Sequence, residues 1–132
     1  MKKRRSQALM SIGVTFSFLV AFGCDGGPSV DSSSTEATVK GVVKVAGNPA
    51  TDGEILFDAS NIKRPNSPLR SAPIGKDGSY TIKTLTGENI IRLGGAITKK
   101  NGSLQAAKRA MIVGSGENTF NFEVAEESKP PR

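Results

Sequence analysis

Apolar and polar residues alternate along several short segments of the chain, with turn-forming residues between them. The period of two is clearest over residues 39–45, 54–58, 79–85 and 119–124, where most alternate positions are apolar or small. This pattern is typical of strands that bury one face and expose the other. Spacings of about ten residues between about six or seven such strands predict an all-β fold, a single antiparallel β-sandwich.

The alternation also predicts the core, because about 15 apolar side chains fall on inward positions of the expected strands. These residues are Val39, Val43, Val45, Ile55, Phe57, Ile74, Tyr80, Ile82, Leu85, Ile91, Leu93, Val113, Phe120, Phe122 and Val124. We expect modest stability, since so small a core must offset the ordering entropy of the whole domain.

Glycine, proline and asparagine predict the connections between these strands. Residues 75–78, Gly-Lys-Asp-Gly, predict a hairpin before the strand at 79–85, and residues 47–53 predict a hairpin or near-hairpin. We expect a long exposed loop over residues 59–71 and a shorter loop over 98–103.

The first 23 residues have a different pattern, with four basic residues followed by an apolar stretch that ends at Gly23. This order is typical of a secretory signal peptide. The apolar stretch is shorter than the roughly 20 residues that span a bilayer, so it is a poor permanent anchor. The sequence therefore predicts that residues 1–23 are removed during export.

Residues 20–24, Val-Ala-Phe-Gly-Cys, resemble a bacterial lipobox, in which a cysteine directly after a small residue receives a diacylglycerol. The resemblance implies lipidation of Cys24 and a cell-envelope protein held to a membrane with its domain outside the cytoplasm. Ala21 and Phe22 depart from the family pattern, which has leucine and a small residue there. The alternative is ordinary signal cleavage that leaves Cys24 as a lone thiol. Asp25 resembles a signal for retention at the inner membrane.

The predicted organisation has four parts in a chain of 132 residues, which has room for one domain. We expect a signal peptide at 1–23, a lipidated flexible tether at 24–37, the sandwich at 38–125 and a disordered tail at 126–132. The tether has almost nothing to bury, so it cannot offset its ordering entropy. Its typical reach of about 20 Å keeps the domain close to the membrane.

The net charge of +6 is concentrated in the leader. Four of the 18 lysines and arginines lie there, so 14 remain against 12 acidic residues in the rest of the chain. A nearly balanced domain lacks the strong positive field that nucleic-acid binding uses, and we exclude that class.

The chain has no histidine and one cysteine. Histidine-based triads, imidazole or thiolate zinc sites, redox pairs and disulfides are therefore excluded. Asp52 and Asp77 each precede a glycine and are better explained by turn formation than by calcium binding. Residues 114–116, Gly-Ser-Gly, lack the lysine of a phosphate-binding loop and predict a turn. We expect no catalytic residues, no metal and no cofactor.

The order of motifs resembles the carboxypeptidase regulatory-like, transthyretin-like domain of small bacterial lipoproteins. The resemblance covers residues 38–124 and is carried by residues 39–43, 53–57, 76–82 and 118–122. It implies a β-sandwich with an accessory role and no active site to carry over.

Several cations lie in expected loops, where they are candidates for contact with an anionic surface. The residues are Lys63, Arg64, Arg70, Lys99 and Lys100. Ordinary solvated loops are the competing interpretation. The partner is then a phospholipid surface, an acidic envelope polymer or an envelope protein.

The sequence leaves three function classes open. The first is a non-enzymatic, lipid-anchored binding or structural module of the cell envelope. The second is a carrier of a small ligand, which needs a deep apolar pocket. The third is a carbohydrate-active enzyme, which needs two carboxylates about 5 to 9.5 Å apart across a cleft.

Overall fold

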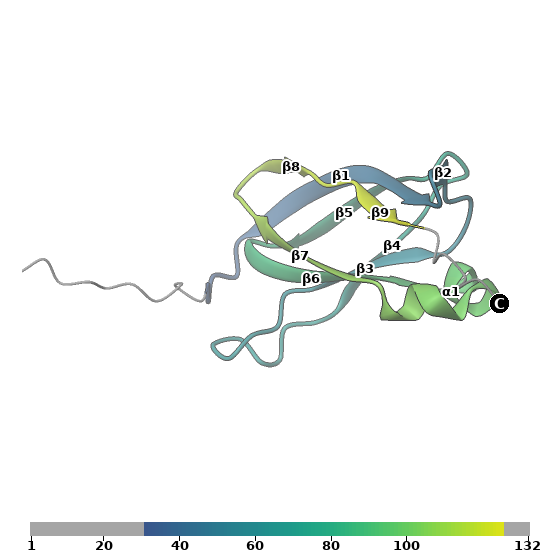
Figure 1. The fold of residues 1–132 in the computed structure, drawn as a ribbon. Coiled ribbons are helices and arrows are strands. Elements are labelled where there is room, and N and C mark those ends of the chain that lie inside the picture. The colour runs from purple at the N-terminus through teal and green to yellow at the C-terminus, as the bar shows by residue number, and fades with distance from the viewer. Residues whose placement is uncertain (1–30, 126–132) are drawn as a thin grey trace, which may run out of the picture.

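The computed structural model describes residues 31–125; the predicted signal peptide, Cys24 and the predicted tail lie outside these residues. The described chain folds into two packed sheets (Figure 1), which confirms the predicted β-sandwich. The first sheet contains β1 (Glu36–Val45), β2 (Asn48–Pro49), β5 (Ser79–Leu85), β8 (Glu117–Thr119) and β9 (Phe122–Val124). The second contains, in spatial order, β4 (Arg70–Pro73), β3 (Glu54–Asp58), β6 (Gly87–Gly94) and β7 (Lys108–Val113).

β1 is the central strand of the first sheet. It pairs antiparallel with β5 and β2, and parallel with β8 and β9. The parallel pairing at the closing edge is a departure from a purely antiparallel sandwich. It arises because the chain crosses to the second sheet for β6 and β7 before it returns to β1.

The closing strand is interrupted at Phe120 and Asn121, whereas the alternation predicts one continuous strand over residues 119–124. The Phe120 N–H donates to the Lys40 carbonyl, as a parallel ladder requires. The Phe120 carbonyl would then accept from the Val42 N–H, but it accepts from the Tyr80 hydroxyl at 2.6 Å. The Asn121 side chain accepts the Val42 N–H instead, at 3.0 Å.

The core lies between the sheets, and the inward residues predicted from the alternation line it. Phe57, Phe122, Ile55, Ile91, Val39 and Val43 are fully buried. The predicted residues Val45, Leu85, Phe120 and Val124 are only half-buried. Four small alanines and two helical residues also belong to the buried set, and the pattern did not assign them: Ala37, Ala50, Ala59, Ala72, Ile97 and Leu104.

The hairpin predicted at residues 75–78 is wrong. The chain does turn there, with Gly78 at φ 81°, but β4 and β5 lie in different sheets. The hairpin predicted over residues 47–53 is also replaced by a crossing, because β1 and β3 lie in different sheets. Only the two-residue β2 folds back on β1.

The loop predicted at residues 98–103 is wrong. Helix α1 (Ala96–Lys100) and the 3-10 helix η1 (Gly102–Ala106) connect β6 to β7 and bury Ile97 and Leu104 against the core. No helix within residues 31–125 is long and apolar enough to cross a membrane.

The domain begins earlier than predicted. Strand β1 starts at Glu36, Ala37 is buried, and the Thr35 carbonyl accepts a hydrogen bond from the Thr86 N–H at 2.9 Å. The last residues of the predicted tether therefore pack on the sandwich, because their backbone groups find partners there. The rest of the predicted tether, residues 24–30, lies outside the described residues.

Candidate functional site

The predicted cations are divided between two ends of the sandwich. The β3–β4 loop, with Lys63 and Arg64, lies at the end where β1 begins, which we call the entry end. Lys99 and Lys100 lie on α1 at the opposite end, which we call the helical end (Figure 1). The fold therefore does not bring the two predicted groups together.

Arg64 is a half-buried structural residue, whereas the sequence predicts an exposed loop cation, either in contact with an anionic surface or solvated. Its Nε donates to the Ala59 carbonyl at 2.6 Å, and its two terminal nitrogens donate to the Ser33 and Thr86 carbonyls, each at 2.7 Å. The planar guanidinium group suits this role because it presents several donors in fixed directions. Arg64 thus joins the β3–β4 loop to the incoming chain and to the β5–β6 connection.

The other predicted cations differ in their surroundings. Arg70 belongs to β4 and pairs with Glu36 at 2.7 Å across the entry end, so the predicted loop stops before it. Lys100 pairs with Asp52. Lys63 and Lys99 are exposed. Exposed ion pairs contribute little to stability, and the contact of these cations with an anionic surface stays a prediction.

Residues 61–64 form a tight turn at the entry end. The backbones of Asn61 and Arg64 are bonded to each other, and the Asn61 side chain accepts from the N–H groups of Lys63 and Arg64. The Asn61 amide also donates to the Asp31 carbonyl at 2.9 Å. Ile62 and Lys63 therefore occupy the tip of a turn whose base is held to the incoming chain.

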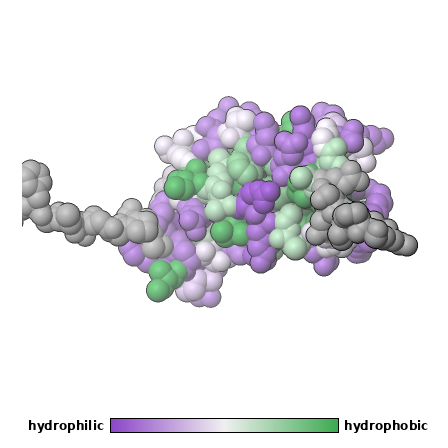
Figure 2. All heavy atoms as spheres, viewed as in Figure 1, coloured by the Kyte–Doolittle hydropathy of each residue, from purple (hydrophilic) through white to green (hydrophobic). Residues whose placement is uncertain are grey.

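Three large apolar side chains of the described residues are exposed to solvent. Ile62 is 86% exposed, Ile112 is 79% exposed and Leu69 is 56% exposed. Ile62 and Leu69 lie on the β3–β4 loop, and Ile112 pairs with Glu88 near the start of β6. Figure 2 shows separate apolar groups on this end and further apolar surface across the middle of the same face. No sequence pattern singles them out, because one apolar residue in a polar loop is common.

A buried polar cluster closes the β5–β6 connection beside Arg64. Thr84 donates to the Asn89 side-chain oxygen at 2.7 Å, and the Asn89 amide donates to the Leu85 and Gly87 carbonyls. Both polar residues are fully buried, so these bonds offset the cost of removing them from water. The cluster fixes the backbone whose Thr86 carbonyl receives Arg64.

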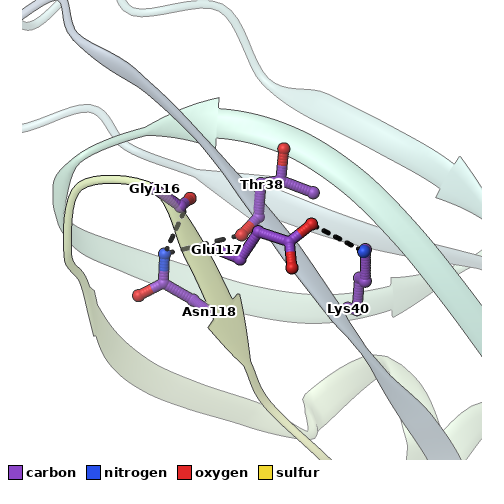
Figure 3. Close-up of polar contacts among 5 residues, drawn as sticks. All are labelled: Thr38, Lys40, Gly116, Glu117 and Asn118. Carbon is purple, nitrogen blue, oxygen red and sulfur yellow. Dashed lines mark hydrogen bonds and ion pairs between the residues drawn. The ribbon is translucent and has the colours of Figure 1, made fainter.

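The glycine-rich segment at residues 114–116 is a turn, as predicted. The Gly114 N–H donates to Asn118 Oδ1 at 2.9 Å, and the Asn118 amide donates back to the Gly114 carbonyl. Figure 3 shows the same amide between Gly116 and Thr38, beside the Lys40–Glu117 ion pair of 2.7 Å. Asn118 therefore fills the turn with its own side chain and aligns β8 on β1.

Two aspartates of the described chain, Asp58 and Asp77, accept hydrogen bonds from nearby serines. Burial is the largest single effect on Asp58 and raises its pKa, but hydrogen bonds from Ser60 and the charge of Arg92 outweigh it and lower the pKa overall. The Ser79 hydroxyl and N–H lower the pKa of Asp77 in the β4–β5 turn. Burial raises the pKa of Tyr80, whose hydroxyl donates a hydrogen bond to the Phe120 carbonyl. Residues 31–125 contain no group of three Asp, Glu, His or Cys side chains placed to hold a metal ion.

Comparison with known proteins adds evidence on the fold. No protein family profile matches the chain, and no curated protein sequence matches it. Among solved structures, it is similar to a DUF3823 family protein from Parabacteroides merdae, with 14% identity and a TM-score of 0.52 over 70% of this chain and 47% of that one. The chain thus spans about half the length of that protein.

Two further structures are more distant. A DUF3823 family protein from Bacteroides ovatus has 15% identity and a TM-score of 0.47, over 67% of this chain and 42% of that one. The TIE protein of Bacillus anthracis has 11% identity and a TM-score of 0.46, over 69% and 17%. The similarity to the Parabacteroides merdae protein, at 14% identity, shows a shared β-rich fold alone. The resemblance to carboxypeptidase regulatory-like domains stays a prediction.

Proposed function

We propose that this chain is a lipid-anchored protein of the bacterial cell envelope, with a β-sandwich that serves as a non-enzymatic binding or structural module. The leader and the lipobox-like residues 20–24 support lipidation of Cys24. Asp25 supports retention at the inner membrane.

The observation that carries the proposal is the attachment of the incoming chain to the entry end. Asp31, Ser33 and Thr35 each give a backbone carbonyl to a donor of the sandwich. Seven residue steps separate Asp31 from Cys24, and a fully extended chain of this length spans at most about 25 Å. A lipid on Cys24 therefore keeps the entry end within about 25 Å of the bilayer.

The surroundings of the carboxylates support a role without catalysis. A general acid at neutral pH needs a raised pKa, whereas Asp58 and Asp77 have lowered ones. Asp52, Glu36 and Glu117 are each paired with a cation. This arrangement suits turns and strand alignment better than the pair of differently tuned carboxylates of a glycosidase.

The partners follow from the position of the charges. The membrane is the partner of the entry end through the anchor. Lys99 and Lys100 place positive charge on the helical end, on the far side of the sandwich. This end is the proposed contact for an envelope protein or acidic polymer.

Replacement of Cys24 tests the anchor directly. Mass spectrometry of the mature protein from its native envelope is expected to show an N-terminal Cys24 carrying diacylglycerol. Cys24→Ser should release the protein from the membrane fraction, while Ser29→Ala, five residues further along, should leave it bound. A free Cys24 thiol, or cleavage at another bond, would contradict the proposal.

A further inference from the structure

The turn at residues 61–64 exposes the apolar side chain of Ile62 at its tip, where polar residues or glycine are usual. Ile62 is 86% exposed, and β-branched apolar residues are unusual at such positions. Lys63, also exposed, stands next to it. An apolar side chain beside a lysine is the combination that amphipathic membrane-surface segments use, because the apolar group enters the lipid and the amine reaches the headgroups.

The base of the turn is unusually well held for an exposed loop. Arg64 fixes it to the carbonyls of Ala59, Ser33 and Thr86, and Asn61 fixes it to the carbonyl of Asp31. A turn held in this way gives its tip a defined direction, so that contact by the tip also orients the whole domain.

The same bonds place the tip next to the chain that leads to Cys24. The two attachment points, Asp31 and Ser33, are the residues through which the path from the lipid enters the domain. At the short range set by seven residue steps, the local concentration of lipid at the tip is high, and a weak contact suffices.

We propose that Ile62 inserts into the bilayer that holds the lipidated Cys24, with Lys63 at the level of the phosphates, so that the entry end docks on the membrane in one orientation. The inference rests on the proposed lipid anchor for its setting. Leu69, 56% exposed on the same loop, extends the apolar contact. The contact is mainly apolar, since Arg64 and Arg70 are engaged with protein groups and Lys63 is the exposed cation of this turn.

The chain has no tryptophan and one cysteine, which permits a clean test. The chain from Cys24 onward, which retains every described residue, is coupled through that thiol to a maleimide lipid in vesicles of phosphatidylethanolamine and phosphatidylglycerol. Ile62→Trp supplies a single reporter at the tip. Lys99→Trp, also at an exposed site but on α1 at the helical end, is the matched control.

The tip reporter is expected to shift its emission to shorter wavelength and to be quenched about threefold more by acyl-brominated lipids than the α1 reporter. Quenching should persist at 1 M salt, where charges are screened beyond about 3 Å. Equal quenching of the two reporters would overturn the proposal. Chemical coupling replaces the cellular lipid, so this result is independent of whether Cys24 is lipidated in the cell.

A photo-reactive side chain at position 62 identifies the occupant in intact cells. Crosslinks to phospholipid are expected, and a control at position 99 should give fewer. Crosslinks from position 62 to a protein in place of lipid would overturn the membrane assignment and make the turn a protein-binding surface.

Discussion

Gly41 has no room for a side chain, because Tyr80 of β5 and the backbone of Phe120 both lie against it. Its position on β1 lies opposite Tyr80 of β5, and the Tyr80 hydroxyl passes over it to reach the Phe120 carbonyl. A Cβ at this position would lie 1.8 Å from that carbonyl oxygen and 3.1 Å from Tyr80 Cε1. Because the nearest obstacle is backbone, a side chain here forces the closing strand away from β1.

We therefore expect Gly41→Ala to lower the free energy of unfolding by about 1–3 kcal/mol, toward the upper end of that range. Gly102→Ala is the matched control, because no atom lies within 4 Å of the added Cβ. Urea titrations of the two variants provide the measurement. Equal stability of the two variants would show that the closing strand tolerates displacement.

Asp58 links the end of β3 to β6 through Arg92, at 3.0 Å. Its folded pKa is lowered, so its contribution to stability is present above the unfolded value of about 3.9 and is lost as pH falls through the folded value. Asp77 acts in the same direction.

The free energy of unfolding should consequently decline below about pH 4, and Asp58→Asn should weaken that decline while lowering stability at pH 7. Denaturant titrations between pH 2 and 7 provide the measurement. The same pH dependence in the wild type and in Asp58→Asn would assign the decline to other carboxylates.

At the scale of elements, the sequence predicts faces better than partners. Alternation with a period of two states which side of a strand is buried, and Val39, Phe57 and Phe122 are all buried as predicted. The alternation carries no information on which other strand pairs with the strand in the sheet. The turn at residues 75–78 has hairpin chemistry, but turn residues only reverse the chain and do not keep it in one sheet.

Helix α1 and the Arg64 contacts were missed for other physical reasons. Helix α1 has five residues and no side-chain N-cap, and it starts after Gly95 at φ 75°, so the usual start signals are absent. Arg64 binds the carbonyls of Ser33 and Thr86, which are 31 and 22 residues away. Backbone carbonyls are present at every residue, so no local pattern marks these partners.

The attachment of residues 31–35 to the sandwich depends largely on Arg64 and can be tested by replacing it. Arg64→Gln cannot reproduce the three donors, so these residues should become sensitive to a protease of broad specificity, with a new N-terminus near Glu36. Lys63→Gln, one residue away, removes a charge but none of these bonds. Mass spectrometry of the fragments should show protection from Asp31 onward in the wild type and in Lys63→Gln. Cleavage at the same site in all three proteins would mean that Arg64 does not hold the segment.

At the scale of the whole molecule, the two ends of the sandwich have different characters. The entry end carries the attached chain, Arg64 and the exposed Ile62, whereas the helical end carries α1 with Lys99 and Lys100 (Figure 1). If the proposed lipid on Cys24 is present, the entry end faces the membrane and the helical end faces away from it. This division explains why the predicted cations do not form one surface.

The parallel pairing of β1 with β8 and β9 also determines when the fold can be completed. Thr38 pairs with Glu117, so the partners are separated by 79 positions in the chain. At synthesis rates of about 5 to 20 residues per second, one edge of β1 waits about 4 to 16 s for its partner to be made. Until then the Val42 N–H lacks the Asn121 side chain, and an open strand edge is a site for unwanted pairing. The edge of β1 that faces β8 and β9 therefore stays open until these last strands pair with it.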